Sequence, residues 1–319
     1  MARAGSLLAV RRLLSAHRAQ PYTTRTARVI TKENTAMLID FRVRPPYKTN
    51  LTTSLYNKPA PSSDPTKQSI FLIGKERVPS AEARSIELFM QEMDETETER
   101  AVIMGRKADD YGSVDNDEID ELARAYPGRF IPFAGVNPNL PGQVEEIERV
   151  AAMGFRGVGI DAGWLRRPLY HDDPVFDPIY AKCQELGMIV SLTSSFMLGP
   201  DLSYSEPCAI QRVAMKYPNM KIVVPHGCWP HVHTALAVAI RCPNVYLMPD
   251  CYIYIDGFAL SDEYIKAANT YLKYRILYAS SYPVRSLSQC LRGWKSRGFT
   301  DEALQNTLYD NAARLLGEK

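Results

Sequence analysis

The sequence predicts a single-domain α/β fold of the (β/α)8 TIM-barrel class, with a long loop after the first strand. Eight short, β-rich apolar runs alternate with helical patterns from residue 37 to the end of the chain. No GxGxxG or GxxxxGK[ST] turn occurs, although an open doubly wound sheet usually carries such a Gly-rich phosphate turn. The alternation and the missing turn together favour a barrel over an open sheet.

The expected strands are short runs rich in Val, Ile, Leu and aromatic residues, which suit a buried parallel sheet. They lie at residues 37–43, 100–106, 129–136, 156–162, 188–195, 221–228, 245–250 and 275–282.

Capping residues indicate where several helices begin and end. Ser80 precedes a helix over 81–93, and Asn116 or Asp117 opens the next. Gly154 and Gly187 stand where two more helices should end in the left-handed conformation that glycine favours. The expected helices after the first are 117–126, 142–153, 174–186, 206–216, 230–241, 262–273 and 286–296, with a last pair across 301–316.

One connection breaks the alternation. Residues 45–79, between the first strand and the first helix, are rich in Pro, Ser, Thr and Asn. A connection of this length in a compact domain is usually functional or disordered. Because it would leave the C-terminal face of the barrel, we expect a lid or an arm that contacts a partner.

Composition excludes several classes of protein. The 319 residues are 45% hydrophobic and 23% charged, which fits a folded core, and no apolar run reaches the ~18–20 residues of a membrane span. The net charge of +2 combines +7 in residues 1–32 with −5 in the remainder, and a mildly acidic body argues against a nucleic-acid partner. The six cysteines are scattered without a CxxC pair, which predicts reduced thiols.

Residues 1–36 form a separate N-terminal segment, and the barrel is expected over 37–319. The segment is Arg-rich up to residue 32 and carries a short amphipathic stripe, as mitochondrial transit peptides do. Alternatively Met37 is the true start, because strand-like sequence follows it directly. We therefore expect either a disordered extension or a transit peptide, with a mitochondrial matrix location in the second case and a cytoplasmic one otherwise.

The candidate site residues are the polar side chains at the C-terminal strand ends, where TIM barrels build their active sites. On the first strand, alternation predicts that Asp40, Arg42 and Arg44 face inward while Ile39, Phe41 and Val43 face the helices. The full set is Asp40, Arg42, Arg44, Arg106, Asn137, Asp161, Thr193, His226, Asp250 and Ser281.

Each candidate also has a structural explanation. Arg42 and Arg44 could cap carbonyls or pair with Asp40, but two inward arginines are costly to bury without anionic partners, which favours a bound substrate anion. Asp161 could cap the loop that follows it, and His226 could be a hydrogen-bonded core histidine. A position at the end of a barrel strand favours a functional role for His226.

A metal site built on cysteine is a weaker hypothesis. Cys228 and Cys251 lie close in sequence to His226 and Asp250, and thiolates bind soft metals. Their spacing matches no zinc template.

Several segments occur in an order that is typical of one family: LID on the first strand, YPGRFIPFAGVNPNLPG, VEEIERVAAMGFRGVGID, VVPHGCWP, PNVYLM, ILYASSYP and DNAARLLG. In these segments the chain resembles, from Met37 to Gly317, the amidohydrolase-related proteins of the metal-dependent hydrolase superfamily. It is most similar to the branch with aminocarboxymuconate-semialdehyde decarboxylase, resorcylate decarboxylases and pyrone-dicarboxylate lactonase. The resemblance implies a TIM barrel and suggests a homodimer.

The sequence departs from this family at its metal ligands. The family's Asp-x-His-x-His motif has Arg42 and Arg44 in place of its two histidines, and the histidine of the fifth strand corresponds to Thr193. Ser281 stands for the aspartate of the eighth strand, and only His226 is kept. A guanidinium cannot coordinate a cation. We therefore predict no metal cofactor, with a divalent ion such as zinc possible only through a rearranged site.

That rearranged site would consist of His226, Asp161 and Asp250. Without a metal, the arginines still supply fixed positive charge, so we predict an enzyme that acts on a small carboxylate-bearing metabolite. Arg42 and Arg44 would clamp the carboxylate.

The remaining candidates complete this hypothesis. Arg106, Thr193 and Ser281 would help to bind the substrate, and His226, Asp161 or Asp250 would act as general acid or base. Hydrolysis of a lactone, ester or amide is the first choice, and decarboxylation is the alternative. A catalytically silent barrel that binds a carboxylated ligand or a partner protein is the third possibility; neither nucleic acid nor membrane is expected as a partner.

Overall fold

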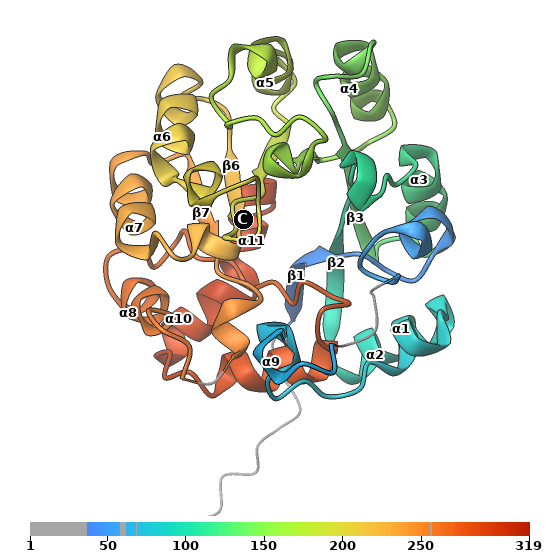
Figure 1. Cartoon of the computed structure of the whole chain (residues 1–319), viewed down its shortest axis with the longest axis vertical. Helices are drawn as coiled ribbons and strands as arrows, with labels where there is room; N and C mark the ends of the chain where they lie inside the picture. Colours follow the sequence, from blue (N-terminus) through green and yellow to red (C-terminus); the bar gives the residue numbers. More distant parts are fainter. Residues whose placement is uncertain (1–36, 58–61, 68, 256) are drawn as a thin grey trace, which may run out of the picture. The chain divides into compact units, whose positions relative to one another are not determined.

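Seven parallel strands form one curled sheet in which the strands are neighbours in sequence order (Figure 1). The computed structural model describes residues 37–57, 62–67, 69–255 and 257–319, and these belong to one compact unit. The first seven predicted strands are confirmed with shorter bounds. They are β1 Leu38–Val43, β2 Thr98–Met104, β3 Phe130–Gly135, β4 Gly157–Ile160, β5 Ile189–Leu192, β6 Ile222–Pro225 and β7 Val245–Met248.

Except for the last one, the helices surround the convex side of the sheet, as the alternating pattern predicts (Figure 1). Side-chain caps start several of them, including Ser85, Asp115, Ser286 and Thr300. The helices are α1 Pro79–Ala83, α2 Ile86–Glu95, α3 Asn116–Ala125, α4 Gln143–Ala152, α5 Asp177–Glu185, α6 Pro207–Lys216, α7 Val232–Arg241, α8 Asp262–Asn269, α9 Leu287–Lys295, α10 Asp301–Gln305 and α11 Asn311–Leu316.

Two helix predictions differ from the structure. The single helix expected over 81–93 is two helices, because Arg84 adopts a left-handed conformation with φ 53° and ends α1. Between α10 and α11 the chain forms a π-helix over Asn306–Asp310, so the expected last pair is continuous through this turn.

The predicted eighth strand, 275–282, is not a regular strand. It is joined to β7 and to β1 by isolated parallel bridges, Leu247 with Ile276 and Val43 with Tyr282. Ser281 has a φ of 56°, which an extended strand cannot accommodate. The segment therefore contacts both edge strands without a continuous ladder.

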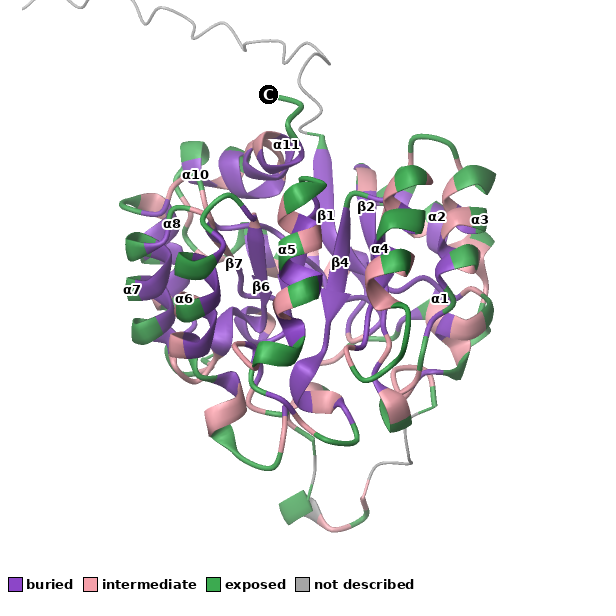
Figure 2. Cartoon of the chain, turned by 90° about the horizontal axis from the view of Figure 1, so that it is seen from above, coloured by how far each residue is buried: buried purple, intermediate pink, exposed green. Residues whose placement is uncertain are grey.

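The concave face of the sheet is apolar at the end where the strands begin. Ile39, Phe41, Phe133 and other strand residues form one cluster with the side chains of α11, and Figure 2 shows α11 at that end of the strands. Gly157 has no room for a Cβ because the Phe133 ring lies against it. This packing leaves the opposite end of the strands for polar side chains.

Because β1 contains a bulge, some of its side chains point to the opposite side from the one predicted. Asp40 pairs with Ala101 and Val43 with Ile103, so three steps on β1 oppose two on β2. The extra residue changes the alternation. Ile39 and Phe41 consequently belong to the concave face, and the prediction that they face the helices was wrong.

The described part of the connection from β1 to α1 contains three short 3-10 helices: η1 Lys48–Thr52, η2 Pro65–Lys67 and η3 Ile70–Leu72. Phe71 of η3 contacts Tyr252 with ring centroids 6.1 Å apart, and the Ile73 carbonyl accepts a hydrogen bond from Arg285 at 2.6 Å. The predicted transit peptide lies outside the described residues. Within the described ranges, no helix has the length and apolar character to cross a membrane.

Candidate active site

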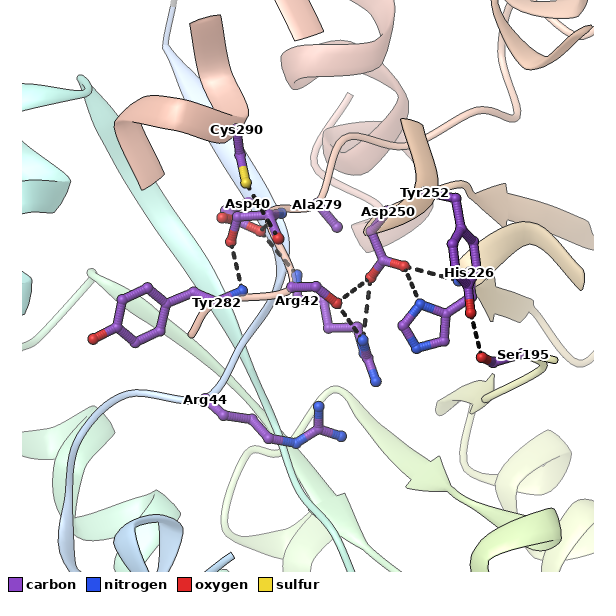
Figure 3. A network of polar contacts seen from close by, with 12 residues as sticks. Asp40, Arg42, Arg44, Ser195, His226, Asp250, Tyr252, Ala279, Tyr282 and Cys290 are labelled. Atoms are coloured by element: carbon purple, nitrogen blue, oxygen red, sulfur yellow. Dashed lines mark hydrogen bonds and ion pairs between the residues drawn. The ribbon is translucent and has the colours of Figure 1, made fainter. Parts of the chain in front are cut away.

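Asp250, two residues beyond β7, is the centre of one group of buried polar side chains (Figure 3). Its Oδ2 accepts hydrogen bonds from Ser281 Oγ at 2.7 Å and from Arg42 Nη1 at 3.2 Å. Arg42 Nη1 also donates to Ser281 Oγ. The structure therefore brings together three predicted residues from strand ends far apart in the sequence.

His226 contacts the other oxygen of the same carboxylate. Its backbone N–H donates to Asp250 Oδ1 at 2.9 Å, and its Nδ1 lies 2.6 Å from that oxygen. Burial would raise the pKa of Asp250, but the interactions with His226 and Arg42 outweigh it and lower the pKa to about 2. Because an ionised carboxylate is only an acceptor, this contact favours the tautomer with the proton on Nδ1, although the two atoms are not aligned as a hydrogen bond.

Burial also lowers the pKa of His226, although Asp250 opposes this effect. The imidazole is therefore neutral near neutral pH. A neutral histidine with its proton on Nδ1, beside a carboxylate, can accept a proton at Nε2.

Asp161, directly after β4, is the centre of a second buried group. Its Oδ2 accepts a hydrogen bond from Arg106 Nε at 3.0 Å, and Arg44 Nη2 lies 3.9 Å away, too far for a hydrogen bond. Burial acts to raise the pKa of Asp161, but Arg106 and Arg44 lower it to about 2, and the Thr193 side chain contributes. Asp161 is thus a weak base that holds two guanidinium groups.

The two groups together contain more cationic than anionic side chains. Arg42, Arg44 and Arg106 oppose only Asp250 and Asp161, a net charge of +1 with His226 neutral. All five side chains are at most 3% exposed. Burial and the neighbouring Arg106 and Arg42 hold the pKa of Arg44 well below its usual range.

Several guanidinium nitrogens in this cluster are buried without a hydrogen-bond partner. They are Nε of Arg42, Nε and Nη2 of Arg44, and Nη2 of Arg106. Unpaired buried donors are costly, and guanidinium edges match the geometry of a carboxylate. The Arg44–Arg106 side of the cluster is therefore built to receive an anion.

Asp40 does not join this cluster, which corrects the prediction that it faces inward with Arg42 and Arg44. It lies with Cys290 of α9, apart from His226 (Figure 3). Its Oδ1 accepts the backbone N–H groups of Arg42 and Ser280, while Oδ2 has no hydrogen-bond partner. Burial raises the pKa of Asp40 to about 7.

Sequence reasoning did not include three further residues at the site. Tyr252 packs beside His226, with ring centroids 5.8 Å apart, and its hydroxyl is hydrogen-bonded to Ser195. The Trp164 ring covers Arg106, whose Cζ lies 4.6 Å from the ring centroid. All three follow strand ends by three or four residues, so the signal that could have found them is their place in the connections after β4, β5 and β7.

The side chains do not fit the divalent-metal centre implied by the family resemblance. Of the described residues, His226, Asp250 and Cys251 are grouped closely enough to hold an ion, whereas Asp161 and Cys228 are outside this group. Both oxygens of Asp250 already accept hydrogen bonds, and the Arg42 guanidinium lies against one of them. Positive charge at that carboxylate opposes binding of a second cation.

Comparison with known proteins identifies the family. The amidohydrolase family profile matches residues 45–317. The chain belongs to the amidohydrolase family. No curated protein matches the sequence of this amidohydrolase-family chain.

The solved structures that resemble this family member include TIM barrels and enzymes of two reaction types. An uncharacterized TIM-barrel protein from Bordetella bronchiseptica is 32% identical with a TM-score of 0.81, over 88% of this chain and 99% of that one. A probable 2-pyrone-4,6-dicarboxylic acid hydrolase from Acinetobacter baumannii is 14% identical with a TM-score of 0.60, over 88% and 99%.

A third structure, 2,6-dihydroxybenzoate decarboxylase from Rhizobium, is 15% identical with a TM-score of 0.59, over 88% of this chain and 98% of that one. At these low identities the last two likenesses show the fold alone. These two structures are named for a hydrolase and a decarboxylase, so likeness in fold does not fix a reaction type.

Proposed function

We propose that the protein is an enzyme that hydrolyses a lactone, ester or amide bond in a small carboxylate-bearing metabolite without the usual divalent metal. The observation that carries the proposal is the set of buried guanidinium nitrogens without partners, in a cluster with a net charge of +1. A bound carboxylate would satisfy those donors and neutralise that charge.

Arg44 and Arg106 would bind the substrate carboxylate through their free edges. Arg42, which was predicted to act with Arg44, donates from Nη1 to Asp250 and to Ser281, and its buried Nε has no hydrogen-bond partner. We therefore assign Arg42 mainly to holding Asp250, with Ser281 as its hydrogen-bonding partner.

His226 would act as the general base. In the hydrolytic step, Nε2 takes a proton from water while the water oxygen forms a bond to the substrate carbonyl carbon. The bond from that carbon to the leaving oxygen or nitrogen then breaks, and His226 returns the proton to the leaving group. Guanidinium donors near the carbonyl oxygen would stabilise the oxyanion, and Thr193 would help to orient Asp161.

Decarboxylation is the second candidate, and the aromatic residues beside His226 favour it. Tyr252 contacts Phe71, Phe196 and Trp229 as well as His226, so a planar aromatic acid could stack there. Two structures similar in fold are named for carboxylated rings, a pyrone dicarboxylate and 2,6-dihydroxybenzoate.

Mass spectrometry with these two compounds tests the proposal. The purified chain is incubated with 2-pyrone-4,6-dicarboxylate or 2,6-dihydroxybenzoate, with further aryl and aliphatic lactone carboxylates, and with chelator as a control. Gain of water supports hydrolysis, and loss of carbon dioxide supports decarboxylation. Binding of a carboxylate without any product would contradict both and identify a silent barrel.

Variants then assign the roles. Arg44→Met should weaken carboxylate binding, whereas His226→Gln should keep binding and lose turnover. Binding that is the same in Arg44→Met and in the unmodified chain would contradict the proposed anion site.

We also propose that residues 1–36 direct import into mitochondria and that the barrel forms a homodimer. The first is tested by import of the full chain into isolated mitochondria against a form that begins at Met37. The second is tested by sedimentation velocity. Equal import of both forms, or a monomer at micromolar concentration, would contradict the respective proposal.

A further inference from the structure

A cavity of about 250 Å³ lies beside the buried cluster, between the connections that follow β2, β4 and β5. It is slightly smaller than typical ligand pockets, which span roughly 300–1,000 Å³. Its wall includes Tyr111, Trp164, Leu165 and Pro168, together with Asp110 and Arg166. The last two form an ion pair at 3.0 Å, so the cavity presents no unpaired charge from them.

Trp164 belongs to the cavity wall and also touches the cationic cluster. Its ring lies over the Arg106 guanidinium, with Cζ 4.6 Å from the ring centroid, and it stacks with Tyr111 at 5.5 Å. The indole Nε1 donates a hydrogen bond to the Met197 carbonyl at 3.0 Å. Trp164 thus separates the cavity from a guanidinium that is itself only 1% exposed.

The position of the ring determines which part of Arg106 a ligand can reach. Arg106 Nε is bonded to Asp161, the Trp164 ring lies over the guanidinium, and the buried Nη2 has no hydrogen-bond partner. Stacking on an aromatic ring holds a guanidinium in a fixed plane. A carboxylate that binds this guanidinium must therefore approach its edge and not the face that the indole covers.

We propose that this cavity holds the part of the substrate beyond its carboxylate. In this proposal the Trp164 side chain forms the wall between the cavity and Arg106 and moves aside when the carboxylate binds Arg106. The inference rests on the proposed function for the identity of the anion. The aromatic and apolar wall and the paired charges suit a small, flat, uncharged group. Trp164 is a positioning residue, since it acts through the orientation and access of Arg106.

Arginine labelling by phenylglyoxal tests the wall without needing a substrate. Labelling of a buried group follows the population of open forms, and peptide mass spectrometry reports each arginine separately. Trp164→Ala should raise labelling of Arg106 by at least about tenfold, while Trp164→Phe, which keeps a ring over the guanidinium, should stay within about threefold of the unmodified chain.

Two controls separate access from loss of fold. Arg285 is also only 1% exposed and lies far along the chain at the start of α9, so its labelling should not change in Trp164→Ala. Arg166→Gln alters the cavity wall without removing the ring and should leave Arg106 protected. Unchanged labelling of Arg106 in Trp164→Ala, or equal increases at Arg106 and Arg285, would overturn the proposal.

A second measurement distinguishes failure of this inference from failure of the proposed function. 2,6-Dihydroxybenzoate and 2-pyrone-4,6-dicarboxylate are each tested for protection of Arg106 in Trp164→Ala. If Trp164→Ala speeds labelling of Arg106 and a carboxylate slows it again, the result supports both the role of Trp164 and the anion site. Faster labelling without protection by these or any other carboxylate supports the wall and contradicts the anion role.

Discussion

The two halves of the buried cluster differ in how completely their charges are paired. Around Asp250, both carboxylate oxygens accept hydrogen bonds, from His226, Ser281 and Arg42. Around Asp161, Oδ2 accepts from Arg106 and lies near Arg44, whereas Oδ1 has no hydrogen-bond partner. Three guanidinium nitrogens of these two arginines also lack partners, against the one Nε of Arg42 beside Asp250. We call the group around Asp250 the saturated half and the group around Asp161 the open half. The saturated half can hold a catalytic base in place, and the open half can bind an anion.

Asp250→Ala should cause the largest loss of stability. It would leave Arg42 and His226 buried without their carboxylate, and breaking a buried ion pair costs about 3–5 kcal/mol. Urea unfolding monitored by circular dichroism measures the change. Asp250→Asn, which keeps an acceptor oxygen, is the control and should lose less; equal stability of Asp250→Ala and the unmodified chain would show that the saturated half does not stabilise the fold.

The next effect is a contrast between Arg42→Met and Arg44→Met. Arg42→Met breaks the pair with Asp250 and should cost about 3 kcal/mol. Arg44 is buried beside two other arginines and has no hydrogen bond to Asp161, so its replacement should change the unfolding free energy by less than about 1 kcal/mol. Equal losses in the two variants, measured by urea unfolding, would remove the distinction between the halves.

The sequence predicted the gathering of this cluster because parallel strands end at one face. Arg42, Arg44, Arg106, Asp161, Thr193, His226, Asp250 and Ser281 were all expected there, and the structure brings them to one buried region. The sequence did not predict which of the two carboxylates has both of its oxygens hydrogen-bonded. That depends on distances of a few ångströms between side chains from different strands, which spacing along one chain does not encode.

The fold was predictable for seven strands and failed at two local irregularities. The bulge between Asp40 and Val43 inserts one residue and reverses the facing of Ile39, Phe41 and Asp40, which alternation cannot foresee. Segment 275–282 has the composition of a strand, yet the positive φ of Ser281 interrupts it. Both irregularities adjoin the site, where local rules are often broken for function.

Asp40, outside both halves, should produce a pH-dependent effect of intermediate size. Its folded pKa of about 7 exceeds the unfolded value of about 3.9, so the folded state binds the extra proton between these values. Its contribution to stability is therefore present at low pH and lost as pH rises toward 7. From pH 5 to 8 the loss is about 2–3 kcal/mol.

Asp40→Asn cannot lose this proton, so the test compares two pH profiles. Urea unfolding free energies of the unmodified chain should fall more steeply between pH 5 and 7 than those of the variant, and the two curves should run parallel above pH 8. Cys290→Ser serves as a neighbouring control that keeps the carboxyl group. Parallel curves over the whole range would contradict a titrating Asp40.

The smallest expected effect concerns the connection that contacts the saturated half through Phe71 and Tyr252. Gln289 holds this connection to α9 by donating to the Gly74 carbonyl at 2.6 Å and accepting from the Glu76 N–H at 3.2 Å. Because these bonds are exposed, Gln289→Ala should cost at most about 1 kcal/mol of global stability. It should nevertheless speed hydrogen exchange of residues 69–76 and the association of any carboxylate ligand, since Phe71 of the connection packs against Tyr252, which lies beside His226. Arg292→Gln, which removes only the exposed pair with Glu76, should have less effect.

Slower or unchanged hydrogen exchange in Gln289→Ala would mean that ligand access to the half around Asp250 does not depend on this connection. The ligand would then have to enter past Trp164, beside the half around Asp161.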